Sequence, residues 1–280
     1  MGPDQTAMAA DWLGACRRAV EGLRAVLSAH PTTLERAVET GRGEGGDLAL
    51  VIDRAAEDVV FAELDALHAA GHRFTAISEE RGEISFGGRD VLVVIDPLDG
   101  SLNAKRGIPQ HALSIAVASG ETMADVEFGY VYDFGASEEW HAGRGTGAWL
   151  NDERLDTSPR ERRDPEGRLE VLGIESADPR WYVDSIEQLA EVAYRLRAVG
   201  AIAVSLCQVA AARFDGLVTL RACRSVDAAA GQLIVREAGG HVAFTGCADP
   251  LGAPLDLAPH TPVVAARTAQ ALAELIPIPR

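Results

Sequence analysis

Apolar residues recur at helical spacing in two long stretches near the start of the chain, and this pattern predicts two helices. The first covers residues 11–30 and ends at Pro31, which cannot continue a helix. The second covers residues 47–70, with Gly71 as its C-terminal stop. The residues between them, 39–47, read ETGRGEGGD, and their glycine content predicts a mobile loop.

The periodicity changes after this second helix, where short apolar and β-branched runs are separated by Gly, Asp and Asn. Runs of this kind predict strands joined by turns. They are HRFTAIS (72–78), VLVVID (91–96), ALSIAVAS (112–119) and DVEFGYVYD (125–133). Residues 134–155 continue with regularly placed glycines, which indicates a β-hairpin.

A polar stretch, residues 157–168, precedes a second half in which strand and helix signals alternate. The helices expected there cover residues 184–195, 203–213 and 227–238. This ordering predicts an α/β (α+β) fold of two lobes. The first would be an α+β lobe over residues 1–156, and the second an α/β lobe over residues 157–280.

Composition and charge narrow the classes of function. The chain has 280 residues and 47% apolar content, which is ample for a large core. Its formal charge of −16 argues against a nucleic-acid-binding surface, because such a surface would repel phosphates. The four cysteines form no CxxC pair and no zinc-ligand spacing, so we expect buried, reduced thiols and a cytoplasmic protein. No apolar run approaches the roughly 18 residues of a membrane span, and we expect no membrane partner.

The segment IDPLDG carries the first chemical signal. Asp96 ends an apolar strand, and Asp99 follows after a turn in which Pro97 fixes φ and Gly100 permits an otherwise strained conformation. The two carboxylates can therefore converge, and they would repel each other unless a cation lay between them. Mg²⁺ prefers oxygen ligands of this kind, and the backbone N–H groups that follow are suited to phosphate oxygens. Taken alone, DPLDG is equally typical of a plain turn.

Two distant segments add further carboxylates. Glu79 and Glu80 stand at the end of another predicted strand, and Asp227 stands at the start of a predicted helix. Taken separately, the glutamates fit a solvated acidic turn and Asp227 fits a helix N-cap. Together with Asp96 and Asp99, they match a known pattern of metal-binding residues.

Four blocks of sequence resemble the inositol monophosphatase family, within the wider superfamily of lithium-sensitive, magnesium-dependent phosphatases that includes fructose-1,6-bisphosphatases. The blocks are DLALVIDRAAE (47–57), SEERG (78–82), IDPLDGSLN (95–103) and VDAAAGQLIVREAGG (226–240). They span most of the chain, and four blocks in the right order are much more specific than one. The resemblance implies a layered αβαβα sandwich of the sugar-phosphatase type, inhibition by lithium and, because dimers are common in the family, a homodimer.

The same resemblance implies a role for each matching residue. Two or three Mg²⁺ ions in each active site would be bound by Glu79, Asp96, Asp99, Asp227 and the backbone carbonyl of Leu98. Gly100 and Ser101 resemble a cradle for phosphate. Ser101 stands in place of a family threonine that orients the attacking water, and Asp53 looks like the partner of that hydroxyl. Glu79 would also accept a proton through water.

The substrate is less well defined, because the sequence departs from the family pattern near it. Val226 replaces a common tryptophan, and Ala201, after Gly200, lacks a hydroxyl often found there. Arg221 and Arg224 stand near the place where inositol-type enzymes often have an acidic residue. Either these arginines are solvated, or one of them binds a second phosphate through its two-pronged guanidinium.

The sequence thus predicts an Mg²⁺-dependent phosphomonoesterase that hydrolyses a small phosphorylated polyol or sugar with a metal-activated water. Inositol 1-phosphate is the first candidate, a fructose-1,6-bisphosphatase or dual-specificity activity is the alternative, and histidinol phosphatase comes third. The substrate-binding residues would be Asp99, Gly100, Ser101, Gly200, Ala201 and Arg221. A metal-binding regulatory protein on the same scaffold would be expected to have lost part of the site, and no matching residue is missing.

Overall fold

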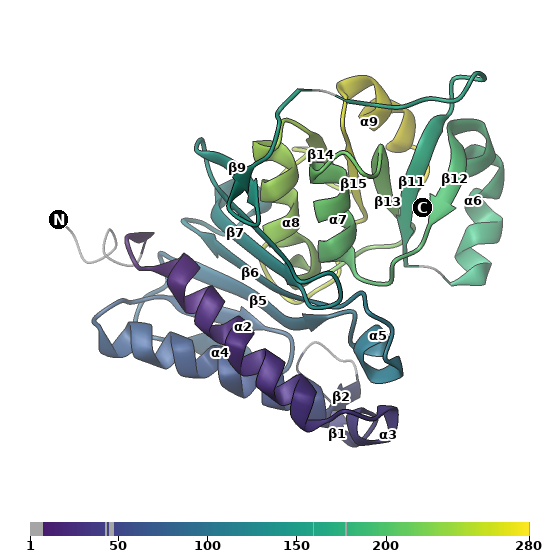
Figure 1. Ribbon diagram of the computed structural model, residues 1–280. Helices are drawn as coiled ribbons and strands as arrows, with labels where there is room; N and C mark the ends of the chain where they lie inside the picture. The colour runs from purple at the N-terminus through teal and green to yellow at the C-terminus, as the bar shows by residue number, and fades with distance from the viewer. Residues whose placement is uncertain (1–7, 43, 45–47, 159, 177, 280) are drawn as a thin grey trace.

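The computed structural model describes residues 8–42, 44, 48–158, 160–176 and 178–279. Two helices cover one face of a first sheet, two more lie between that sheet and a second one, and further helices cover the outer face of the second sheet (Figure 1). This is the αβαβα sandwich expected from the sequence, so the predicted fold class is confirmed.

The first layer is formed by α2 (Trp12–Ala29) and α4 (Val51–Ala69). The Asp11 side chain caps α2 by accepting a hydrogen bond of 2.9 Å from the Gly14 N–H. The second helix begins later than predicted, because β2 (Leu48–Leu50) pairs with β1 (Glu39–Arg42). The prediction of a loop was therefore wrong for residues 39–42, and residues 43 and 45–47 lie outside the described part. A short helix, α3 (Thr33–Arg36), lies between α2 and β1.

The first sheet has eight strands among the described residues, in the order β10-β9-β8-β7-β6-β5-β3-β4. They are β3 (Thr75–Ser78), β4 (Gly82–Ser85), β5 (Leu92–Asp99), β6 (Ala112–Ala118), β7 (Val126–Asp133), β8 (Glu138–Gly143), β9 (Gly147–Leu150) and β10 (Glu153–Arg154). In β5, Val93 and Ile95 pack with the first helical layer, whereas Leu92 and Val94 pack with the middle layer. Burial of both faces explains why this strand is continuously apolar in sequence.

The second sheet has the order β12-β11-β13-β15-β14 in the part of the chain that is described. Its strands are β11 (Leu169–Glu175), β12 (Ala193–Arg197), β13 (Gly216–Thr219), β14 (His241–Phe244) and β15 (Val263–Ala266). Its outer face is covered by α6 (Pro179–Val192) and α9 (Ala269–Leu275). The helix predicted over 184–195 begins earlier, after the Asp178 cap, and its last residues instead form the start of β12. Strands β4 and β15 and helix α9 were not predicted.

The middle layer consists of α7 (Ile202–Ala210) and α8 (Ser225–Glu237), both close to their predicted positions. Small side chains allow these helices to lie between two sheets, and they include Ala203, Ala210, Ala228, Ala229 and Ala230. The closest approach is at Gly129 of β7, where an added Cβ would lie 2.7 Å from the Ala230 carbonyl oxygen. Helix α8 is thus held against the first sheet at backbone contact distance.

Three of the cysteines, Cys16, Cys207 and Cys223, are buried, and Cys247 is partly buried. All four are free thiols, as the sequence predicted. Among the described residues, no helix is long and apolar enough to cross a membrane.

The contact at Gly129 gives a prediction about stability. Gly129→Val should push α8 away from β7, because the new side chain would overlap the Ala230 backbone. Overpacking of this kind typically lowers the free energy of unfolding by about 1–3 kcal/mol. Urea denaturation would measure the change, and an unchanged midpoint would show that α8 is not held at this distance.

Candidate active site

Two aspartates are brought together by an irregularity at the end of β5. Asp96 pairs with Ser114 of β6 and Asp99 pairs with Ala112, and the register shifts between these two pairs. In a regular strand, residues three apart point to opposite faces, whereas a bulge can turn both to the same side. The Asp96 carboxylate also accepts a hydrogen bond of 2.9 Å from the Leu98 N–H, which fixes the turn.

The third carboxylate of this cluster is that of Asp227, in the first turn of α8. Asp96, Asp99 and Asp227 each offer an oxygen, and these atoms all lie within 4.8 Å of one another. All three residues are buried, with 2%, 7% and 8% of their surface exposed. Burial, and then the charge of Glu79, raise the pKa of Asp96, and burial followed by the charge of Asp227 raises the pKa of Asp99.

The backbone beside the cluster is tightly packed at Gly100. Its φ is +82°, and an added Cβ would lie 2.9 Å from the Gln110 carbonyl oxygen and 3.1 Å from both the Ala201 Cβ and the Gly200 carbonyl oxygen. Only glycine fits this conformation and this contact without strain. Gly200 and Ala201 therefore lie against the start of α5 (Ser101–Arg106), as the candidate site requires.

A second group of acidic residues, which shares Asp96 with the first, lines a narrow cavity at the end of β5. Its walls include Asp53, Glu79, Glu80, Asp96 and Ser101. The Asp53 carboxylate uses Oδ2 to accept a hydrogen bond of 2.9 Å from the Leu50 N–H, whereas its Oδ1 is buried without a hydrogen-bond partner in the described structure. Burial raises the pKa of Asp53 to about 6, and burial together with the Glu79 charge raises the pKa of Glu80 to about 7.

These features fit a divalent-cation centre. The donors are carboxylate oxygens, which Mg²⁺ prefers, and they come from four separate segments of the chain. The Oδ1 of Asp53 and the Oε2 of Glu80 are buried with no hydrogen-bond partner in the described part of the chain. Buried oxygens without partners are costly unless a ligand satisfies them. The residues present therefore suit a hard cation, with Leu98 beside them on β5.

Arg224 lies between the aspartate cluster and Glu79, a position that the sequence did not predict. Its Nη1 donates to Glu79 Oε1 at 2.7 Å, and its Nη2 donates to Asp227 Oδ1 at 3.3 Å. Its side chain is 17% exposed, so the alternative of a solvated surface arginine is wrong for Arg224. Arg221 lies elsewhere, against α6, with its guanidinium 3.5 Å from Asp184 and over the ring of Trp181.

Sequence reasoning also missed Glu175, the last residue of β11. This residue is 2% exposed. It accepts hydrogen bonds from the N–H groups of Val199 and Gly200 at 3.0 Å and from the Ser205 hydroxyl at 2.6 Å. It therefore holds the segment that contacts Gly100. The signal was present in the sequence, since an acidic residue at the end of an apolar strand needs buried partners.

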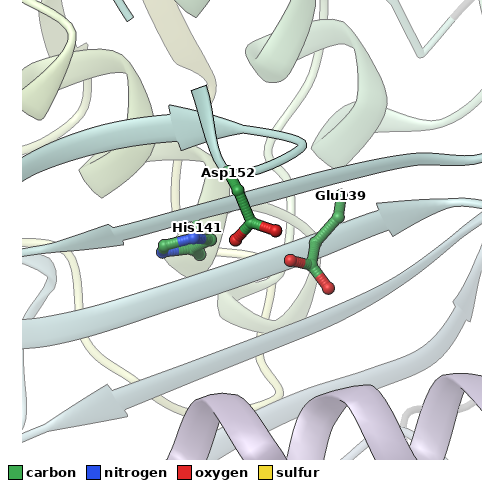
Figure 2. A group of neighbouring side chains, drawn as sticks. All are labelled: Glu139, His141 and Asp152. Atoms are coloured by element: carbon green, nitrogen blue, oxygen red, sulfur yellow. The ribbon is translucent and has the colours of Figure 1, made fainter. Parts of the chain in front are cut away.

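A different cluster, made of Glu139, His141 and Asp152, lies on the face of the first sheet that α2 covers (Figure 2). Both carboxylates are paired with the Arg17 guanidinium of α2, each at 2.6 Å. The ring of His141 is stacked on that of Trp149. This cluster already has a counter-ion and is more exposed than the aspartate cluster, so it is a weaker candidate for a metal site.

The fold and the buried acidic centre define a class: layered α/β proteins of the sugar-phosphatase type with a site suited to divalent cations. The chain belongs to the inositol monophosphatase family, whose model matches residues 5–278. The resemblance found in the sequence is thereby confirmed.

Individual relatives agree with this assignment. The chain is 37% identical over 214 residues to the Nus factor SuhB of Escherichia coli strain K12, with 75% of this chain and 77% of that protein covered. It is 36% identical over 203 residues to the fructose-1,6-bisphosphatase/inositol-1-monophosphatase of Thermococcus kodakarensis, with 72% of each covered. The solved structure of the extragenic suppressor protein suhB from Bartonella henselae matches with a TM-score of 0.77 at 27% identity, covering 96% of this chain and 98% of that one.

The raised pKa values predict how stability depends on pH. An acid with a higher pKa in the folded state holds its proton there while the unfolded chain has lost it, so raising the pH through this interval removes stability. For Asp53 the interval runs from about pH 4 to about pH 6, and for Glu80 it extends to about pH 7. The melting temperature of the protein in EDTA should therefore fall between pH 4.5 and pH 7.

Differential scanning fluorimetry would measure this fall, and Mg²⁺ should raise the melting temperature more at pH 7 than at pH 5. Asp53→Asn provides the comparison, because it removes one of the two groups and should flatten the profile. A melting temperature that rises steadily over this range would contradict the assignment of these buried acids.

Proposed function

We propose that this protein is an Mg²⁺-dependent phosphomonoesterase that hydrolyses a small phosphorylated polyol or sugar. The observation that carries the proposal is the convergence of the three buried carboxylates of Asp96, Asp99 and Asp227. Without a cation these groups repel one another in a desolvated place, and such an arrangement costs stability. Membership of the inositol monophosphatase family supports the same conclusion.

In this proposal the metal ligands are Glu79, Asp96, Asp99, Asp227 and the Leu98 carbonyl, for two or three Mg²⁺ ions. Bound Mg²⁺ would supply positive charge at the phosphate and lower the pKa of a coordinated water. The Asp96 side chain lies between the two acidic groups, since it belongs to the aspartate cluster and also lines the cavity with Glu79. It is therefore the residue best placed to serve both halves of the centre.

The nucleophilic water would be oriented by Ser101 and Asp53. These residues line the same cavity, and Asp53 Oδ1 has no hydrogen-bond partner in the described structure. Asp53 would hold the Ser101 hydroxyl, and that hydroxyl would direct the water toward phosphorus. Glu79 would accept a proton through water. The N–H groups of Gly100 and Ser101 would hold the phosphate oxygens, as the family resemblance implies.

For the substrate, we propose inositol 1-phosphate first and fructose 1,6-bisphosphate as the alternative. The alcohol portion would lie against Asp99, Gly200 and Ala201, which are adjacent to the start of α5. A relative at 36% identity is named for both activities. Arg221 would bind a second phosphate after exchanging its ion pair with Asp184 for the ligand, because that pair is long, at 3.5 Å, and partly exposed.

A second candidate function is that of a regulatory factor, because a relative at 37% identity is named a Nus factor. The complete acidic centre favours the enzyme.

We also propose that the protein forms a homodimer, which the family resemblance implies, and that it is divided into two lobes, residues 1–156 and 157–280. The division into lobes is supported by the sheets, since the first ends at Arg154 and the second begins at Leu169.

Substitution of a shared ligand tests the enzyme assignment. Asp96→Asn should lower Mg²⁺-dependent phosphate release by more than about 100-fold, because even changes beyond the metal ligands commonly cost 10–100-fold. The variant should melt no lower than the wild type in EDTA, since it removes one repelling charge. Asp65→Asn, an exposed change on α4, is the matched control and should leave the release of phosphate unchanged. Full activity in Asp96→Asn would overturn the proposed metal ligands.

A panel of substrates tests the specificity. Phosphate release would be measured from inositol 1-phosphate, fructose 1,6-bisphosphate and histidinol phosphate at equal concentrations, each with Mg²⁺ and with EDTA. Arg221→Gln should raise the KM for the bisphosphate by about tenfold or more and leave that for inositol 1-phosphate little changed, since a lost charge-assisted hydrogen bond costs about 1.5–3 kcal/mol. Equal effects on both substrates would argue against a second phosphate site at Arg221, and no turnover of any substrate would favour the regulatory candidate.

A further inference from the structure

The guanidinium of Arg224 joins two carboxylates that are far apart in sequence. Glu79 follows β3 of the first sheet, whereas Asp227 belongs to α8 in the middle layer. Arg224 reaches both, at 2.7 Å and 3.3 Å, and its own backbone N–H donates to Asp227 Oδ2 at 3.1 Å. An arginine at the start of α8 thus spans the gap between two layers of the fold at its acidic centre.

Both partners of Arg224 belong to the proposed set of metal ligands. A carboxylate oxygen that holds a guanidinium at hydrogen-bond distance cannot also bind Mg²⁺ without bringing two positive charges close together. The repulsion between them is strong because the surroundings are buried and weakly screening. The guanidinium and a divalent cation are therefore alternatives at Glu79 and Asp227.

We propose that Arg224 is an internal counter-ion that competes with divalent cations for Glu79 and Asp227. In the metal-free protein it neutralises part of the acidic centre and holds β3 and α8 together. Full loading with metal requires the guanidinium to leave these two carboxylates. The inference rests on the proposed metal centre and adds to it a device that weakens metal binding.

A purely structural ion pair would behave differently. Such a pair would stabilise the protein equally with and without metal, because its partners would be the same in both states. A competitor stabilises only the metal-free protein, and its removal tightens metal binding by linkage. Metal affinity and melting temperature can therefore separate the two cases without any assay of activity.

The first experiment measures Mg²⁺ affinity by isothermal titration calorimetry. The full chain is stripped of metals with EDTA, dialysed, and titrated with MgCl₂ alone. Arg224→Gln should bind Mg²⁺ at least about tenfold more tightly than the wild type, because no cation must be displaced. Arg213→Gln is the matched control. It also removes one positive charge and an ion pair to a carboxylate, that of Glu138, away from the centre, so its affinity should remain that of the wild type.

The second experiment compares melting temperatures in EDTA and in saturating Mg²⁺. Arg224→Gln should melt several degrees below the wild type in EDTA, and the difference should disappear in Mg²⁺. Equal losses under both conditions would show a structural pair and overturn the proposal. If Arg224→Gln fails to fold, Arg224→Lys can replace it, because lysine keeps the charge but lacks the two-pronged geometry. Arg224→Lys should bind Mg²⁺ more tightly than the wild type, by less than the tenfold expected for Arg224→Gln.

The outcomes also separate this inference from the proposed function. Equal Mg²⁺ affinity in the wild type, Arg224→Gln and Arg213→Gln would overturn only the role of Arg224. An absence of Mg²⁺ binding in all three would overturn the metal centre itself, and the inference with it.

Discussion

Repulsion among buried carboxylates is the constraint on which the site depends. Oxygens of Asp96, Asp99 and Asp227 lie within 4.8 Å of one another. Each pair of full charges at that separation would repel by roughly 3–4 kcal/mol at an effective dielectric constant of about 20. A typical domain has only about 5–15 kcal/mol of stability. The chain therefore needs protons, an internal cation or metal ions at this place, and only metal ions also give the centre its proposed chemistry.

The rest of the fold holds these charges where they would not otherwise stay. The irregular end of β5 turns Asp96 and Asp99 to the same side, and α8 brings Asp227 to them from the layer between the sheets. Contact of α8 with Gly129 limits how far that helix can retreat. Glu175 accepts hydrogen bonds from Val199 and Gly200 and so holds the segment that contacts Gly100. The large buried core thus offsets the cost of holding like charges close together.

The sequence predicted those parts of the structure that local patterns determine. A continuously apolar run before Asp96 identified β5, and helical spacing identified α8. The order of the layers was implied by the resemblance to the inositol monophosphatase family. The sequence did not predict that β1 pairs with β2, because the glycines near these strands are typical of a loop. The place of Arg224 was also missed. Its side chain reaches Glu79 across two layers, and such a contact between distant segments leaves no periodic signal in sequence.

Crystals soaked with Mn²⁺ would show directly whether metal binds at the aspartate cluster, because the anomalous scattering of Mn²⁺ identifies the ion. We expect anomalous peaks within about 2.5 Å of the carboxylate oxygens of Asp96, Asp99 and Asp227. Peaks at Glu139, His141 and Asp152 alone, or no peak beside Asp96, would contradict it.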